Sequence, residues 1–357
     1  MFDSLPTELI HQIVLCLPID SKPWFLIFLC KQFHRSLVDE TFVLQHLVKY
    51  NAFATPDIVY DLCGLYQTIY ASRHFKEDKN ITWNGVVTKE ALNVFNTLPS
   101  LEVLSLFMYQ IEDPVYEKPT PPVLNSNSII NLRLTYCHGE IPKWTLPNLE
   151  ILAITSHQSK PQPIPSHIGS HPHLKSLLIS NANMTGPFPS SFFSLTSLTR
   201  LSIDRTNLCT TIPPEFSHLA SLTHVDMNEC NLHGPIPDFS PLQNLVQLYL
   251  RSNNLTGPIP SSIGALKNLI YLALDRNSLS GEIPVELGAI PLKTLVLEFN
   301  SELCGPLPSS FSARIGKMDG LFVDGTAIVG VTRSDGRGLN SVMDIQKLID
   351  AGMAVNS

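Results

Sequence analysis

The sequence predicts an α/β solenoid, a rod of stacked units with short parallel strands along one face. Eight pairs of an apolar residue followed by proline recur between residues 141 and 308, and successive pairs lie 23 or 24 residues apart. A fixed period of this length is typical of repeat proteins and not of globular cores. Each period also holds an alternating apolar run, such as Leu248 and Leu250, which fits a strand buried on one face. Because a solenoid presents a long continuous surface, the pattern favours binding over catalysis.

The repeating unit is clearest in residues 245–260, where the pattern is L-x-x-L-x-L-x-x-N-x-L-T-G-x-I-P. This pattern resembles the plant-type leucine-rich repeat, and the resemblance implies a horseshoe or superhelix. Gly257 suits a backbone conformation that a β-carbon disfavours, and Pro260 ends the strand because it has no N–H to donate. Nine units are expected, starting at Leu101, Ile129, Leu149, Leu174, Leu198, Leu222, Leu245, Leu269 and Leu292.

The asparagine of the motif is expected to turn the chain and to bond backbone groups that the turn exposes. Only the last three units have asparagine at this position. The C-terminal units are therefore predicted to be regular and the N-terminal units degenerate. In chain order, the turn position holds Tyr109, Cys137, His157, Ala182, Thr206, Cys230, Asn253, Asn277 and Asn300.

Residues 1–50 follow a helical period instead, with apolar stripes that predict three short helices. The segment resembles an F-box in Leu5-Pro6-Thr7-Glu8-Leu9, in Ile13, Leu17 and Pro18, and in Leu29-Cys30-Lys31-Gln32-Phe33. The resemblance implies an N-terminal three-helix F-box-like module. The alternative is a helical cap that covers the open end of the solenoid, which terminal repeats need.

The F-box resemblance also implies a partner and a function. F-box proteins bind a Skp-type adaptor, which connects them to a cullin–RING ubiquitin ligase, and the rest of the chain holds the substrate. We therefore expect a substrate-recognition subunit of such a ligase, with an unknown substrate protein bound to the repeats. By the same resemblance, the adaptor-binding residues are Leu5, Pro6, Leu9, Ile13, Leu17, Leu29, Cys30 and Phe33.

The segments on either side of the predicted solenoid, residues 98–311, carry weaker signals. Residues 51–97 are expected to form a helical connector or N-terminal cap that packs the first module against the repeats. Residues 312–357 are expected to form a C-terminal cap or a partly ordered tail. Within this tail, two apolar runs, 321–323 and 327–329, flank Asp324-Gly325-Thr326, which predicts a β-hairpin.

The charge, the apolar segments and the cysteines indicate in which cellular compartment the protein resides and which classes of partner it binds. The net charge of −7 and the pI near 5.9 argue against nucleic-acid binding. The N-terminus has no basic segment of a secretory leader, and no apolar stretch is long enough for a membrane span. The seven cysteines form neither C-x-x-C nor the close pairs that flank secreted plant repeat proteins. These features predict a reduced, intracellular protein of the cytoplasm or nucleus.

The common catalytic and nucleotide-binding motifs are absent from the sequence, so neither an enzyme nor a cofactor is expected. His167, His171 and His173 lie close together, which is a spacing that metal sites use. They stand among Pro and Ser, with no Cys or carboxylate beside them. We therefore expect a solvated loop on the convex side and no metal.

The residues flanking each buried strand position should point to the concave face. In the units from Leu198 onward these residues are polar, charged and aromatic, and Arg and Tyr are frequent in interface hot spots. The alternative is that they form a ladder of cross-strand pairs that only solvates the sheet. The expected target-binding patch comprises Arg200, His224, Asp226, Tyr249, Arg251, Tyr271 and Asp275.

Two further functions stay open on the sequence alone. One is an intracellular repeat scaffold with no connection to ubiquitin, whose first helices serve as a cap. The other is a secreted receptor-like or inhibitor-like repeat protein, since the repeats resemble those of secreted families. Glycans on Asn183 or Asn254, or a disulfide, would favour the secreted alternative.

Overall fold

A computed structural model describes residues 79–84, 95–96, 98–107, 124–136, 141, 143–156, 160–311 and 317–329. The eight residues expected to bind an adaptor, Leu5 to Phe33, lie outside these ranges, as does most of the expected connector. No helix in the described ranges is both long enough and apolar enough to cross a membrane.

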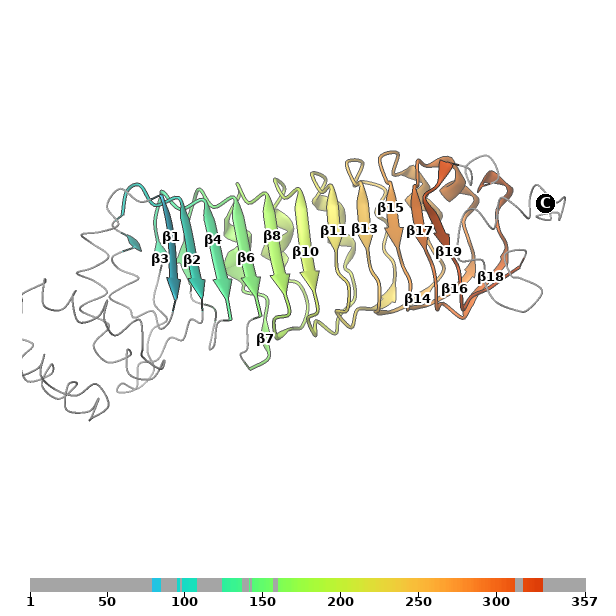
Figure 1. The fold of residues 1–357 in the computed structure, drawn as a ribbon, viewed down its shortest axis with the longest axis horizontal. Helices are drawn as coiled ribbons and strands as arrows, with labels where there is room; N and C mark the ends of the chain where they lie inside the picture. Colours follow the sequence, from blue (N-terminus) through green and yellow to red (C-terminus); the bar gives the residue numbers. More distant parts are fainter. Residues whose placement is uncertain are drawn as a thin grey trace, which may run out of the picture.

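A parallel sheet of eleven strands runs along one side of the described chain (Figure 1). The predicted parallel-strand solenoid is therefore confirmed, and the sheet continues beyond residues 98–311 at both ends. Each of the nine expected units contributes one strand, which begins two residues after the predicted start. The strands are β1 (Asn80–Asn84), β2 (Val103–Phe107), β4 (Asn131–Thr135), β6 (Ile151–Thr155), β8 (Ser176–Ser180), β10 (Arg200–Asp204), β11 (His224–Asp226), β13 (Gln247–Tyr249), β15 (Tyr271–Ala273), β17 (Thr294–Val296) and β19 (Gly320–Phe322).

Further strands form a second row after the turn of the units. Five of them pair in parallel: β12 (His233–Pro235), β14 (Asn254–Gly257), β16 (Ser278–Glu282), β18 (Glu302–Pro306) and β20 (Ala327–Val329). In the earlier units β3 (Leu124–Asn125) pairs with β5 (Trp144–Thr145), and β7 (Gln162–Pro163) pairs with β9 (Met184–Thr185).

The return path of a unit uses a short 3-10 helix. The proline of the apolar-Pro pair is the N-cap of at least five of these helices, where its fixed φ suits the entry into the turn. The helices are η2 (Ser166–Ser170), η3 (Ser190–Ser194), η4 (Pro214–His218), η5 (Ser261–Ala265), η6 (Val285–Ala289) and η7 (Ser309–Phe311).

The apolar side chains of the motif fill the space between the sheet and the 3-10 helices. The inward-facing apolar residues of the strands, such as Leu201, Val225 and Leu248, are buried, and four phenylalanines pack where η3 meets η4. Phe188 contacts Phe216 edge-on with ring centroids 5.0 Å apart, and Phe192 and Phe193 complete the cluster. Burial of such rings stabilises the contact between successive units, which is the only contact a solenoid repeat has.

The turn after each strand differs in one detail from the sequence-based expectation. The left-handed residue is the one before the expected turn position, with φ between 50° and 58° in Tyr136, Ser156, Asn181, Arg205, Glu229, Ser252, Arg276 and Phe299. The asparagine itself stabilises the turn by side-chain hydrogen bonds. The expectation for Gly257 is confirmed, because its φ is 77°.

The expected hairpin at residues 321–329 is not formed. Strand β19 pairs in parallel with β17, and β20 pairs in parallel with β18. Met318, Leu321 and Val323 are buried in the places that leucines occupy in the other units. The segment is therefore a tenth repeat, because stacking on β17 buries these three side chains whereas an isolated hairpin would leave them exposed.

Candidate functional site

The expected target-binding residues come together on four neighbouring strands of the main sheet. Arg200 on β10 aligns with His224 on β11, and His224 aligns with Gln247 on β13 and then Tyr271 on β15. Asp226 aligns with Tyr249 in the next row. Arg251 and Asp275 lie two residues beyond the ends of β13 and β15. We call these seven residues, Arg200, His224, Asp226, Tyr249, Arg251, Tyr271 and Asp275, the concave patch.

Arg251 is held from both sides. Its guanidinium Nε lies 3.0 Å from Oδ2 of Asp275, and its backbone N–H donates to Oδ1 of Asn228 over 2.7 Å. The Asp275 side chain is only 6% exposed, and Arg276 approaches the same oxygen at 3.9 Å. Burial raises the pKa of Asp275, and the nearby Arg251 opposes that rise. Part of the expected cross-strand ladder is thus present, and it leaves the Arg251 side chain about half exposed.

His224 and Asp226 lie side by side with perturbed pKa values. Burial, and then the charge of Arg200, lower the pKa of His224, while its Nδ1 lies 2.7 Å from the Thr223 hydroxyl. Burial is the largest cause that raises the pKa of Asp226, although the Asn228 N–H donates to its Oδ1 over 3.1 Å. The perturbation favours an uncharged imidazole at neutral pH, so this part of the patch offers hydrogen bonds and one carboxylate.

Tyr249 and Tyr271 form the aromatic part of the patch. Both are partly buried, and burial, with Tyr271 and Asp226 nearby, raises the pKa of Tyr249. Phenol groups can donate and accept hydrogen bonds. Ala273 follows Tyr249 across the sheet, so the ring borders a position with a small side chain. The arrangement places aromatic surface beside hydrogen-bonding groups, which suits contact with an extended chain.

The structure adds acidic and aromatic residues that the sequence analysis did not select. Glu298 and Asp324 continue the row of Asp275 at the ends of β17 and β19, and burial together with the Asp324 and Asp275 carboxylates raises the pKa of Glu298. In the next row the Arg276 guanidinium lies 4.5 Å from the centroid of the Phe299 ring. The spacing of Met318, Leu321 and Val323 could have revealed the unit that contributes Asp324.

The histidine cluster is only partly the solvated loop that we expected: His173 is exposed, His167 is half-buried and His171 is buried. His171 is 2% exposed, and its Nδ1 lies 2.9 Å from the Ile168 carbonyl oxygen. Burial lowers the pKa of His171. The ring of His167 stands edge-on to Trp144 at 4.5 Å. The His171 ring is thus part of the core between units, and no group of three or more His, Cys, Asp or Glu in the described ranges could hold a metal ion.

Three cysteines in the described ranges are free thiols. Cys209 and Cys304 are exposed, and Cys230 is buried at a turn position. The Cys230 thiol lies 2.8 Å from the Ile203 carbonyl oxygen and accepts a bond from the Thr206 hydroxyl over 3.2 Å. Burial raises its pKa to about 11, so it acts as a small hydrogen-bonding core residue and not as a reactive thiol.

Comparison with known families finds leucine-rich repeats in this chain. A profile described as Leucine rich repeat matches residues 172–232, and a second, described as Leucine Rich Repeat, matches residues 244–266. No F-box domain is detected. No curated protein matches the chain.

Several solved plant receptor structures share the fold. The Arabidopsis receptor kinase HAESA, in complex with the peptide hormone IDA and the co-receptor SERK1, is 28% identical with a TM-score of 0.59, and the match covers 71% of this chain and 43% of that chain. The HAESA leucine-rich-repeat ectodomain with an N-terminally extended IDA peptide is 28% identical with a TM-score of 0.55, covering 68% and 41%. A TDR receptor is 23% identical with a TM-score of 0.58, covering 69% and 46%. This chain therefore spans less than half of each of these structures.

These comparisons contradict three expectations drawn from residues 1–50 and from composition. The similar structures are plant receptor ectodomains with peptide ligands, so the ubiquitin-ligase subunit, the Skp-type adaptor as partner and the intracellular location are wrong. The F-box resemblance rested on a Leu-Pro start, on Leu29-Cys30-Lys31-Gln32-Phe33 and on apolar residues at helical spacing between them. Any amphipathic helix can show such a stripe, so it carries little information about a partner.

Proposed function

We propose that this chain is an extracellular, receptor-like leucine-rich-repeat protein whose concave face binds a peptide. The observation that carries the proposal is the similarity to HAESA, whose structure contains a bound peptide hormone, over 71% of this chain. The proposal assigns binding, and not catalysis, to the repeats.

The concave patch supports peptide binding by its chemistry and its dimensions. Its four strands span about 14 Å, since strands lie about 4.8 Å apart, and about four residues of extended peptide cover that distance. Two tyrosines give large contact areas at a low cost in side-chain entropy. Arg251 is already oriented by Asp275, so little conformational freedom is lost when a ligand binds it.

A panning experiment tests the binding site. A phage-displayed random dodecapeptide library is selected on the full chain, and the dissociation constants of the selected peptides are measured by calorimetry. Tyr249→Ala and Tyr271→Ala should each weaken binding about tenfold or more, as removal of an aromatic hot spot does. Tyr136→Ala is the matched control, because Tyr136 is exposed and follows β4, far along the sheet. Equal affinity for all four proteins would refute the concave site.

Glycosylation tests the location separately. Asn254 is exposed and opens β14 in the sequence Asn254-Leu255-Thr256, which is an acceptor site for an N-glycan in exported proteins. Protein purified from its native source should release a glycan on treatment with an amidase, which leaves Asp at position 254 in the peptide mass spectrum. A peptide that carries unmodified Asn254 throughout, in protein recovered from a cytosolic fraction, would refute the extracellular assignment.

A further inference from the structure

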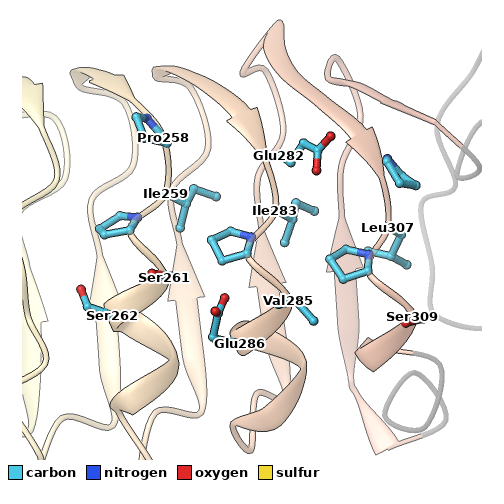
Figure 2. Close-up of a pocket in the computed structure, with 14 residues that line it drawn as sticks. Pro258, Ile259, Ser261, Ser262, Glu282, Ile283, Val285, Glu286, Leu307 and Ser309 are labelled. Carbon is cyan, nitrogen blue, oxygen red and sulfur yellow. The ribbon is translucent and has the colours of Figure 1, made fainter. Parts of the chain in front are cut away.

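A groove outside the concave patch crosses three successive units of the solenoid. It has a volume of about 760 Å³ and lies where β14, β16 and β18 pass into η5, η6 and η7 (Figure 2). Its lining consists of residues 258–262, 282–286 and 306–309. The volume is within the range of clefts that bind ligands or short chain segments.

The walls of the groove provide apolar surface and few donors. Five of the lining residues are proline, and a proline has no backbone N–H. Ile259, Ile283 and Leu307 are buried, one in each of the three stacked units that Figure 2 shows. A ligand therefore finds ring surface to pack against and little backbone N–H with which to pair. Recognition of a ligand must depend on the side-chain acceptors of the groove.

Two carboxylates provide those acceptors. Glu282 ends β16 and Glu286 lies in η6, and both are exposed. Neither carboxylate forms a hydrogen bond or ion pair within the described part of the chain, and no Lys, Arg or His is among the residues that line the groove. The preceding unit has Pro258 and Ser262 at the equivalent positions, so the pair of acids belongs to the middle unit alone.

We propose that this groove binds an arginine-bearing segment of a partner protein. The guanidinium group has five N–H donors and no acceptor, which complements walls that offer mainly acceptors. It forms paired hydrogen bonds with a carboxylate, and its flat faces pack on apolar rings. It is also more weakly hydrated than an ammonium group, so it enters apolar surroundings more readily than lysine does. The net charge of −7 adds a general attraction for a cationic segment.

The test uses a fluorescein-labelled hexapeptide of alternating arginine and proline as the probe, with the full chain and fluorescence anisotropy. A second peptide replaces each arginine by citrulline, which keeps the shape and removes the charge. The wild-type chain should bind the arginine probe about tenfold tighter than the citrulline probe, the contrast that loss of charge-assisted hydrogen bonds produces. The double variant Glu282→Gln with Glu286→Gln should lose that preference.

The matched control is Glu215→Gln. Glu215 is exposed and follows Pro214 in η4, at the position that Glu286 occupies in its own unit, but it does not line the groove. This variant should bind the arginine probe as the wild type does, and all variants should keep the wild-type circular dichroism.

Three outcomes would overturn the proposal: no preference of the wild type for arginine over citrulline, full binding by the double variant, or an equal loss in the Glu215 control. The last would mean that only the overall charge attracts the probe. Because the groove is separate from the concave patch, Tyr249→Ala should leave binding of the arginine probe unchanged, so failure here and failure of the proposed function are distinguishable.

Discussion

Replacing Asn253 by alanine should destabilise the solenoid far more than an average substitution. The Asn253 side chain is buried and makes five hydrogen bonds to backbone groups of two units. Its Oδ1 accepts from the N–H groups of Cys230 and Leu232, each over 3.0 Å. Its Nδ2 donates to the carbonyl oxygens of Met227, Leu250 and Arg251 over 2.8, 3.0 and 3.2 Å.

The size of the expected loss in stability depends on how many of these backbone groups have no other hydrogen-bond partner. The Leu250 oxygen also accepts from Asn277, and the Arg251 oxygen also accepts from the Glu229 N–H. The substitution therefore leaves two N–H groups, of Cys230 and Leu232, and the Met227 carbonyl without a partner. A buried unsatisfied group costs about 1–3 kcal/mol, so we expect a loss of about 3–5 kcal/mol once water enters part of the space left by the amide.

Urea denaturation of the full chain, followed by circular dichroism, measures this loss. Asn254→Ala is the matched control, because Asn254 is the next residue and is exposed, and it should change stability by less than about 0.5 kcal/mol. Cys230→Ala should fall between the two, since its thiol makes fewer and weaker bonds to the backbone. If Asn253→Ala and Asn254→Ala were equally stable, the buried amide would not be what stabilises the turn.

Two other positions test the packing between units. Gly169→Ala should cost about 1–3 kcal/mol in the same urea assay, because a β-carbon there would lie 2.1 Å from the Ser191 backbone oxygen of the next 3-10 helix, whereas Ser170→Ala on the exposed side should be neutral. Burial lowers the pKa of His171 in the folded chain, so the unfolded chain binds the proton first as the pH falls below about 6.5. The stability that the neutral His171 side chain contributes is therefore complete above that pH and is lost below it. Thermal melting points of wild type and His171→Gln between pH 7 and 5 should therefore converge, and parallel curves would contradict the assignment.

The repeat was predictable because one spacing fixes many residues at once. The positions of Leu245, Leu248 and Leu250 define which side chains are buried, and the same spacing located all nine expected strands. The sides of the sheet follow from alternation alone, so Tyr249 and Tyr271 could be placed on the concave face before their surroundings were known.

Two sequence-based predictions were wrong, namely the hairpin at residues 321–329 and the exposure of His171. Met318 replaces the first leucine of the last unit, and Asp324-Gly325-Thr326 is also a turn signal, so local chemistry favoured a hairpin over a repeat. His171 seemed solvated because its neighbours in sequence are polar, but the turn directs its ring toward Trp144. The groove at Glu282 and Glu286 could not be predicted, because it depends on how three units stack.

The buried asparagines also connect the fold to the concave patch. Asn253 donates to the Arg251 carbonyl oxygen, and Asn277 donates in the same way to Asp275 over 3.2 Å. In these two units the asparagine bond fixes the peptide group of Arg251 or of Asp275, and the side chains of both residues lie at the edge of the concave patch. The units that have asparagine are therefore those whose charged edge is held most firmly, and a ligand that binds there meets side chains on a backbone already ordered by the core. Since a preorganised site loses less entropy on binding, this order supports the peptide site that we propose at Arg251 and Asp275.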